Sequence, residues 1–181
     1  QRKARVLENT GAGVVLSPSG IIATNTHIIY GAQQILVALE GGQEFPAEVI
    51  YISPQYDFSF LRITAPGPLT AVEWAAPQEI SLGQDVITIG HSPLLDKTIS
   101  GGTIAAIGVR SNDSAQTPEF IQLSINHYPG DSGGPVFDRE GRFIGLMNAK
   151  RMSTDKTSFA IPVDKLLAAY LSLGPSKKNT P

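Results

Sequence analysis

The chain has 181 residues, 41% of them hydrophobic and 17% charged, and its formal net charge is −2. This composition is typical of a globular domain and excludes an extended disordered chain. The sequence contains no cysteine, which excludes disulfides, cysteine nucleophiles and Cys-based zinc sites. No basic run indicates nucleic-acid binding, and no apolar run reaches the roughly 18 residues that a membrane span needs.

The first half of the chain consists of short apolar segments, rich in Val and Ile, that are separated by turn residues. Residues 13–16 and 21–24 flank a Ser-Pro-Ser-Gly turn, and this pattern predicts a β-hairpin. Further strands are predicted at residues 34–39, 47–52 and 58–63. The Pro-Gly-Pro sequence that follows breaks the pattern and predicts the start of a crossover segment.

The second half repeats this pattern and ends in a helix. Its predicted strands are residues 85–91, 98–110 (interrupted by two glycines), 120–125, 135–138, 143–149 and 158–161. Apolar residues then recur at helical spacing from Val163 to Leu171, with Asp164 and Gly174 as the expected caps.

Strands spaced about ten residues apart favour a barrel or a sandwich, and two similar sets of strands favour two barrels. We therefore predict an all-β fold in one domain, residues 1–181, with a C-terminal helix. The predicted parts are an N-terminal barrel at about 8–65, a crossover at about 66–80, a C-terminal barrel at about 81–162 and the helix at about 163–173.

The clearest chemical signal is the segment Pro-Gly-Asp-Ser-Gly-Gly-Pro at residues 129–135. A serine nucleophile needs a base to take its proton and hydrogen-bond donors for the oxyanion that develops. Glycines beside Ser132 permit a tight turn that aims backbone N–H groups at one point. Ser132 is therefore the predicted nucleophile, and the amides of Gly130 and Ser132 are the predicted oxyanion hole.

Two further segments supply the partners that this serine needs. His27 follows an apolar strand and is the predicted general base and acid. Asp57 directly precedes another apolar strand and is predicted to orient the imidazole and stabilise its charged form. Either residue alone would more often be structural, but the chain order His, Asp, Ser favours a catalytic triad.

These motifs resemble the chymotrypsin-like fold and, more closely, its HtrA (Deg) branch. The matching stretches are residues 11–20, 24–29, 81–90, 100–108, 129–135, 141–148 and 158–162, which span most of the chain. The resemblance implies two six-stranded antiparallel barrels with the catalytic cleft between them, and hydrolysis of polypeptide substrates through an acyl-enzyme without a cofactor. It also implies protein quality control in a bacterial periplasm, in the secreted fraction or in an organelle. HtrA-like proteases often form trimers through N-terminal segments, but residues 1–10 are short and polar here, so both a trimer and a monomer are open alternatives.

The sequence departs from the HtrA pattern at several points. HtrA proteins usually carry peptide-binding PDZ domains after the protease, and this chain ends at residue 181 without one. Asp131 stands where HtrA motifs usually have Asn, and we expect it either to hydrogen-bond locally or to face solvent. Since no Ile-Val-Gly-Gly start is present, activation by a new N-terminus is not expected. His91 begins a His-Ser-Pro segment where the family tends to have Gly-Asn-Pro.

By the same resemblance, the pocket for the substrate residue before the scissile bond (P1) is lined by Asn126, His127, Met147, Asn148, Ala149 and Lys150. His127 and Lys150 lead to the hypothesis that a polar or acidic P1 residue is tolerated. The alternative is that both side chains point away and that the pocket takes small aliphatic residues.

Two other functions compete with that of an active endopeptidase. A regulated or low-activity module that binds peptides would keep the triad but rest in an inactive state, with loops 111–117, 124–131 and 150–156 as the mobile candidates. An esterase with a G-x-S-x-G elbow fits less well, because a strand is predicted after the serine and the triad order differs. The three histidines lie far apart and lack metal-binding spacing, so no metal site is predicted.

Overall fold

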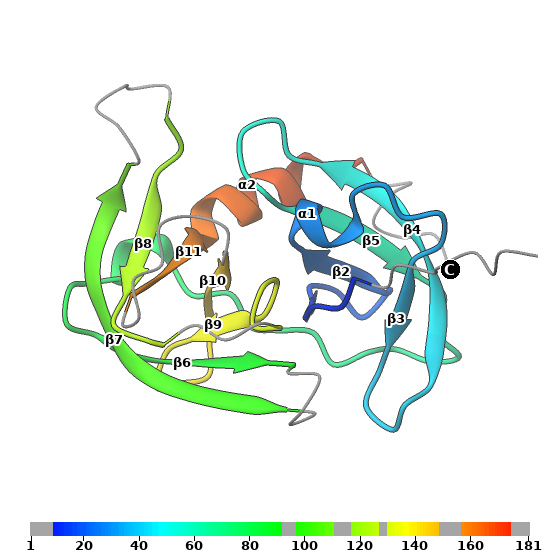
Figure 1. Ribbon diagram of the computed structural model, residues 1–181, viewed down its shortest axis with the longest axis horizontal. Helices are drawn as coiled ribbons and strands as arrows, with labels where there is room; N and C mark the ends of the chain where they lie inside the picture. Colours follow the sequence, from blue (N-terminus) through cyan, green and yellow to red (C-terminus); the bar gives the residue numbers. More distant parts are fainter. Residues whose placement is uncertain (1–8, 92–96, 111–116, 127–129, 149–156, 175–181) are drawn as a thin grey trace, which may run out of the picture.

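The computed structural model describes residues 9–91, 97–110, 117–126, 130–148 and 157–174. Figure 1 shows two strand-rich halves side by side, with the C-terminal helix α2 running between them. Within these ranges, no helix is long and apolar enough to cross a membrane.

The N-terminal half is one antiparallel sheet with the strand order β1-β2-β5-β4-β3. Its strands are β1 (Val14–Val15), β2 (Ile21–Thr24), β3 (Leu36–Ala38), β4 (Glu44–Ile52) and β5 (Ser59–Ile63). The central strands β2 and β5 are almost wholly buried, because apolar side chains cover both of their faces.

The predicted closure of this half into a six-stranded barrel is wrong, since the sheet has five strands and is open. Its edge strands β1 and β3 are only two and three residues long, and they do not pair with each other. The crossover segment also occupies the free edge of β1, where Val72 N–H donates to Val15 O at 3.0 Å.

The C-terminal half is a closed barrel of six strands in the order β10-β11-β8-β7-β6-β9, as predicted. The 3₁₀ helix η1 (Pro77–Glu79) precedes it. Its strands are β6 (Asp85–Gly90), β7 (Thr98–Val109), β8 (Phe120–Leu123), β9 (Pro135–Phe137), β10 (Phe143–Met147) and β11 (Ser158–Pro162). Strand β7 continues through Gly101 and Gly102, which the sequence pattern had suggested as a break. A side chain at Gly102 would collide with Ile125 and the backbone of Ser124, so the glycine permits close packing.

Helix α2 (Val163–Ser172) confirms the predicted C-terminal helix, but its caps differ from those expected. Pro162 is the N-cap and Leu173 the C-cap, and no side chain caps the N-terminus. Proline fits this position because the first backbone N–H groups of a helix have no carbonyl acceptor within the helix, so the missing N–H of proline breaks no helical hydrogen bond. Asp164 instead lies in the first turn, where it pairs with Lys165 at 2.8 Å.

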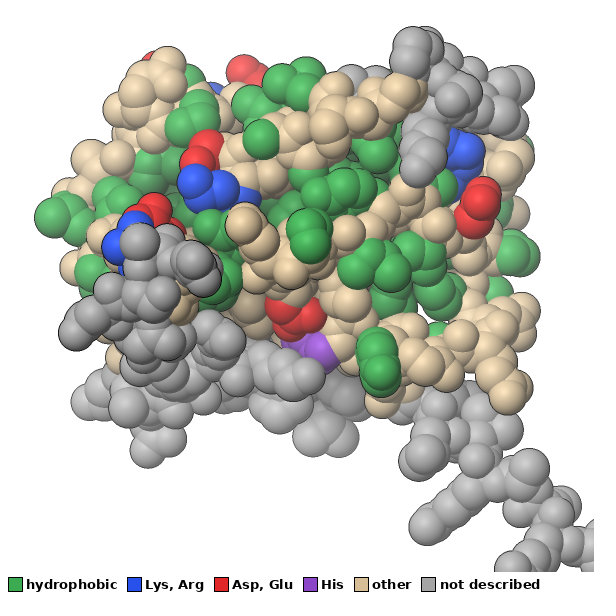
Figure 2. Space-filling view, turned by 90° about the horizontal axis from the view of Figure 1, so that it is seen from above, with side chains coloured by type: hydrophobic (Ala, Val, Ile, Leu, Met, Phe, Trp, Pro, Cys, Tyr) green, Lys and Arg blue, Asp and Glu red, His purple; other side chains and the backbone are tan. Residues whose placement is uncertain are grey.

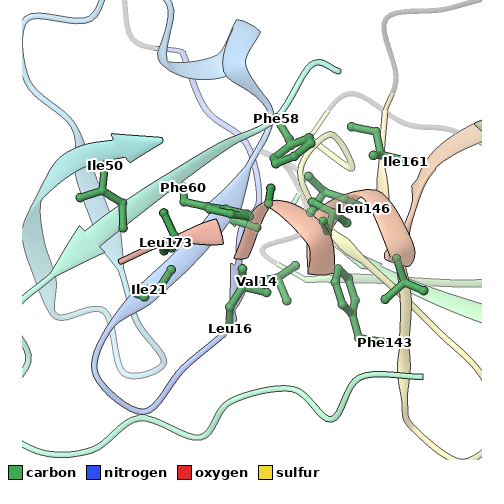
Figure 3. Close-up of a cluster of buried hydrophobic side chains, with 14 of the residues drawn as sticks. Val14, Leu16, Ile21, Ile50, Phe58, Phe60, Phe143, Leu146, Ile161 and Leu173 are labelled. Carbon is green, nitrogen blue, oxygen red and sulfur yellow. The ribbon is translucent and has the colours of Figure 1, made fainter. Parts of the chain in front are cut away.

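One hydrophobic cluster joins the two halves and the helix (Figure 3). Phe58 and Phe60 enter it from the N-terminal sheet, Phe143 and Leu146 from the barrel, and Leu166 from α2. All five side chains are almost completely buried. Because this core is shared, it fixes the orientation of one half against the other, and so it positions any site to which both halves contribute.

Candidate active site

His27 and Asp57 form the best-defined polar pair of the site. His27 lies on the short helix α1 (Thr26–Ile29), directly after β2. Its backbone N–H donates to Asp57 Oδ1 at 2.9 Å, and its ring Nδ1 lies 2.5 Å from Asp57 Oδ2. A carboxylate only accepts, so Nδ1 carries a proton, and in the neutral imidazole the lone pair then lies on Nε2. This arrangement makes Nε2 the basic atom of the pair.

The backbone around Asp57 is held by the segment that carries His27. Asn25 Nδ2 donates to Asp57 O at 2.8 Å, and Thr26 N–H approaches the same oxygen at 3.4 Å. The hydroxyls of Thr26 and Ser59 lie 2.8 Å apart. These contacts tie the end of β2 to the start of β5, so the imidazole and the carboxylate keep a fixed relative position.

Ser132 lies in a tight loop between residue 130 and the start of β9. Gly130 and Gly133 have φ values of 103° and 79°, which favour glycine at both positions. Gly134 N–H donates to Asp131 O at 3.0 Å, and Gly133 N–H donates to Met147 O at 3.1 Å. Ser132 itself is 8% exposed. The loop therefore keeps Ser132 almost fully buried. Its backbone conformation is one that the glycines at positions 130 and 133 adopt readily.

This loop packs against the segment that carries His27. Ala12 N–H donates to Ser132 O at 2.9 Å, and Thr24 Oγ1 donates to Ala12 O at 2.8 Å. A Cβ at Gly133 would collide with Ala12 O and would lie 2.8 Å from Thr24 Oγ1 and 3.2 Å from Ile28 Cδ1. Since Thr24 and Ile28 lie on either side of His27 in the chain, the two halves bring the serine loop and the histidine segment together.

Asp131 was expected either to form a local hydrogen bond or to face solvent. Its side chain is 1% exposed, so it does not face solvent. Its Oδ1 accepts from Thr98 Oγ1 at 3.0 Å. Gly90, the last residue of β6, provides the space, because a Cβ there would overlap this carboxylate. His91 N–H also donates to Gly130 O at 3.2 Å, so the end of β6 supports the loop at two points.

The residues predicted for the P1 pocket are only partly described. Asn126 is exposed, whereas the side chains of Met147 and Asn148 are buried. Asn148 N–H donates to Phe159 O at 2.8 Å, which continues the pairing of β10 with β11. His127, Ala149 and Lys150, on which the polar-pocket hypothesis depends, lie outside the described residues, as do most of the three loops considered for regulation.

An open hollow of about 280 Å³ lies beside the imidazole–carboxylate pair. Among the described residues, Thr26, His27, Tyr30 and Asp57 line it. On the face in Figure 2, a histidine side chain lies against an acidic one, with a hydrophobic side chain close by. Tyr30 was not singled out from the sequence. The available signal was its position three residues after His27, which brings the two onto one side of a helical turn.

The trypsin-like peptidase domain family matches residues 11–146, about three quarters of the chain. The chain belongs to this family. The strand β9 that follows Ser132 agrees with it and disfavours the strand-to-helix elbow of an esterase. The domain is thus a serine protease domain of the trypsin-like class.

Relatives among curated proteins are bacterial serine proteases. The chain is 33% identical over 167 residues to the serine endoprotease DegS of Haemophilus influenzae, covering 87% of this chain and 48% of DegS. It is 33% identical over 165 residues to a Pseudomonas fluorescens protein described as a "Probable periplasmic serine endoprotease DegP-like", covering 90% of this chain and 34% of that protein. The chain therefore spans half or less of the length of these relatives.

Solved structures that resemble this chain are also of serine proteases of the HtrA type. The HtrA-type protease AlgW with a decapeptide superposes with a TM-score of 0.79 at 31% identity, covering 90% of this chain and 50% of the AlgW chain. The resemblance to HtrA proteases drawn from the sequence motifs is confirmed by these relatives and structures.

Proposed function

We propose that this domain hydrolyses peptide bonds of polypeptides with Ser132 as nucleophile, His27 as general base and acid, and Asp57 as the group that orients His27. The observation that carries the proposal is the double hydrogen bond between His27 and Asp57, at 2.9 and 2.5 Å. The bond at Nδ1 selects the tautomer whose Nε2 can accept a proton, which is the form that a serine nucleophile requires.

In the first half of the reaction, Ser132 Oγ attacks the scissile carbonyl carbon and its proton passes to His27 Nε2. The carbonyl oxygen becomes an oxyanion, which the N–H groups of Gly130 and Ser132 stabilise by hydrogen bonds. The imidazolium then protonates the departing amine as the C–N bond breaks. Asp57 stabilises the charge that His27 carries during this step.

In the second half, a water molecule gives a proton to His27 Nε2 and attacks the acyl-enzyme carbonyl. The C–O bond to Ser132 breaks, Ser132 Oγ recovers its proton from His27, and the carboxylic acid product leaves. Both stages of the reaction use the same residues, and the cycle consumes one water and needs no cofactor.

We assign the P1 pocket to the six residues predicted from the HtrA resemblance. The preference for small aliphatic P1 residues stays a prediction, because the side chain of Met147 is completely buried in the core of the barrel. Tolerance of a polar or acidic P1 residue through His127 and Lys150 stays a prediction. A profile of cleavage products from a peptide library decides between these two specificities.

The names of the relatives support a periplasmic or secreted location, and the AlgW complex supports peptide-like substrates. Assembly into trimers stays a prediction from the family resemblance. Size-exclusion chromatography with light scattering at several protein concentrations tests it directly.

The proposed function is tested by cleavage of an unfolded protein, such as reduced casein, followed by mass spectrometry of the products. Wild-type protein is expected to give internal cleavage, whereas Ser132→Ala and His27→Ala are expected to give none above background. Equal cleavage by wild type and Ser132→Ala would contradict the assignment of the nucleophile.

A further inference from the structure

Asp57 lies in a loop between β4 and β5 that is closed by hydrogen bonds. Ser53 N–H donates to Phe58 O at 3.0 Å, and Tyr56 N–H donates to Ser53 Oγ at 3.1 Å. Phe58 N–H also donates to Tyr56 O at 2.9 Å, which makes Asp57 the middle residue of a γ-turn. The direction in which the Asp57 side chain leaves the loop is therefore set by Tyr56 and Phe58.

Tyr56 connects this loop to the C-terminal barrel. Its hydroxyl accepts a hydrogen bond from Glu119 N–H at 3.3 Å, directly before β8. Its ring meets that of Phe120 edge-on, with the ring centroids 5.9 Å apart and an interplanar angle of 68°. The same ring lies 6.5 Å from that of Phe58, which belongs to the core that both halves share. The residue before Asp57 in the chain thus contacts the start of β8.

The barrel gives this contact a fixed support. Strand β8 is hydrogen-bonded to β7 on one side and to β11 on the other. Its first residue, Phe120, is buried, and the side chain of Glu119 forms an ion pair with Arg110, directly after β7. Because both residues that Tyr56 contacts are held in the barrel, they fix the position of the loop that carries Asp57.

We propose that Tyr56 is a positioning residue of the triad, which acts through Asp57 by holding its loop against β8. The inference rests on the proposed peptidase function. Asp57 binds both the backbone N–H and the ring Nδ1 of His27, at 2.9 and 2.5 Å, and such a double bond tolerates little displacement. A shift of about 0.5 Å in the carboxylate is enough to weaken it and to release the imidazole from its productive orientation.

The competing explanation is that Tyr56 only adds packing energy to the shared core. Tyr51 on β4 provides the comparison, because its ring stacks on that of Phe58 at 5.9 Å and on that of Phe60 at 5.3 Å. These partners belong to the N-terminal half. A role in packing alone predicts similar effects at both tyrosines, whereas a positioning role predicts a loss of activity only at Tyr56.

The test measures kcat and KM on a quenched fluorescent peptide, together with urea denaturation, for wild type, Tyr56→Ala, Tyr56→Phe and Tyr51→Ala. Tyr56→Ala is expected to lower kcat about 10–100-fold and to keep KM within about three-fold, because Asp57 acts in the reaction rather than in peptide binding. Tyr56→Phe keeps the ring contact with Phe120 and is expected to recover kcat to within about five-fold of wild type. Tyr51→Ala is expected to lose a comparable unfolding stability but to keep kcat within about three-fold.

A second measurement reports on the bond between His27 and Asp57 without turnover. A proton held in a short, charge-assisted hydrogen bond gives a strongly downfield proton NMR resonance, and the proton on His27 Nδ1 is in this position. Tyr56→Ala is expected to shift this resonance upfield or to broaden it through exchange with water. Tyr51→Ala is expected to leave it unchanged.

Three results would each overturn the inference: a kcat of Tyr56→Ala within about three-fold of wild type, an equal loss of kcat in Tyr51→Ala, or an unchanged Nδ1 resonance in Tyr56→Ala. In each case wild type still cleaves the peptide, and the proposed function stands. Where Tyr56→Ala does not fold, Tyr56→Leu replaces it with the same expected results, because leucine keeps apolar volume but supplies neither the ring nor the hydroxyl. Absence of cleavage by wild type would contradict the proposed function, and the Nδ1 resonance would still test whether Tyr56 positions Asp57.

Discussion

Gly90 and Asp131 are complementary in shape: the end of β6 carries no side chain where the carboxylate of the serine loop lies. A methyl group at Gly90 would overlap Asp131 Oδ1 and would also lie 2.8 Å from Thr98 Oγ1. The barrel and the residue before Ser132 therefore fit together only while position 90 is glycine.

The first prediction follows from this contact. Gly90→Ala is expected to push Asp131 and its loop out of place, with a loss of about 1–3 kcal/mol in the free energy of unfolding. The rate of fluorophosphonate labelling is expected to fall in parallel. Gly101→Ala in β7 is the matched control, because its added methyl would lie an ordinary 3.9 Å from Val86 O. Equal labelling of wild type and Gly90→Ala would contradict the prediction.

The hydrogen bond between Thr98 and Asp131 gives the second prediction. Because Asp131 is buried, Asp131→Ala and Thr98→Val are each expected to destabilise the fold by about 1–3 kcal/mol. A double-mutant cycle measured by urea denaturation is expected to show a coupling of about 0.5 kcal/mol or more. Strict additivity of the two changes would show that this bond contributes nothing to the loop.

The third prediction concerns the pair at the centre of the site. Asp57→Asn keeps the shape of the side chain but presents an amide N–H toward Nδ1, which favours the wrong imidazole tautomer. We expect kcat to fall by about 10³–10⁴-fold with little change in thermal stability. Asp164→Asn, at a partly exposed acidic residue on α2 far from residue 57 in the chain, serves as the control in the same peptide assay. A fall in kcat of less than ten-fold would contradict the role of Asp57 in the catalytic triad.

The shared core supplies the fourth prediction. Phe60 is completely buried and its ring lies 6.5 Å from that of Tyr170 on α2 and 5.3 Å from that of Phe58. Phe60→Ala is expected to cost about 3–5 kcal/mol in the free energy of unfolding. Leu82→Ala, at an exposed turn residue, is expected to stay within about 0.5 kcal/mol of wild type. Similar unfolding midpoints for the two variants would show that the core is not shared as described.

Local sequence signals were sufficient for the elements and for the motifs at the site. The glycines around Ser132 predicted a tight loop, and two of them have the positive φ values that only glycine adopts readily. The apolar spacing after Val163 predicted α2 because one face of the helix packs on the core. These features depend on residues close together in the chain.

Features that depend on contacts between residues far apart in the chain were predicted wrongly or not predicted at all. The N-terminal sheet is open, and Val72, far along the chain, donates a hydrogen bond to the edge of β1. Asp131 is buried because Gly90 and Thr98 surround it, and no pattern near residue 131 indicates either partner. Tyr30 resembles any exposed turn residue until its position beside Asp57 is known.

The central claim is that Ser132 is a nucleophile activated by His27 and Asp57. Intact-mass analysis after treatment with a fluorophosphonate, on wild type and Ser132→Ala, tests it most directly. The account predicts one adduct on wild type and none on Ser132→Ala. An adduct of equal yield on both proteins, or none on wild type, would contradict it.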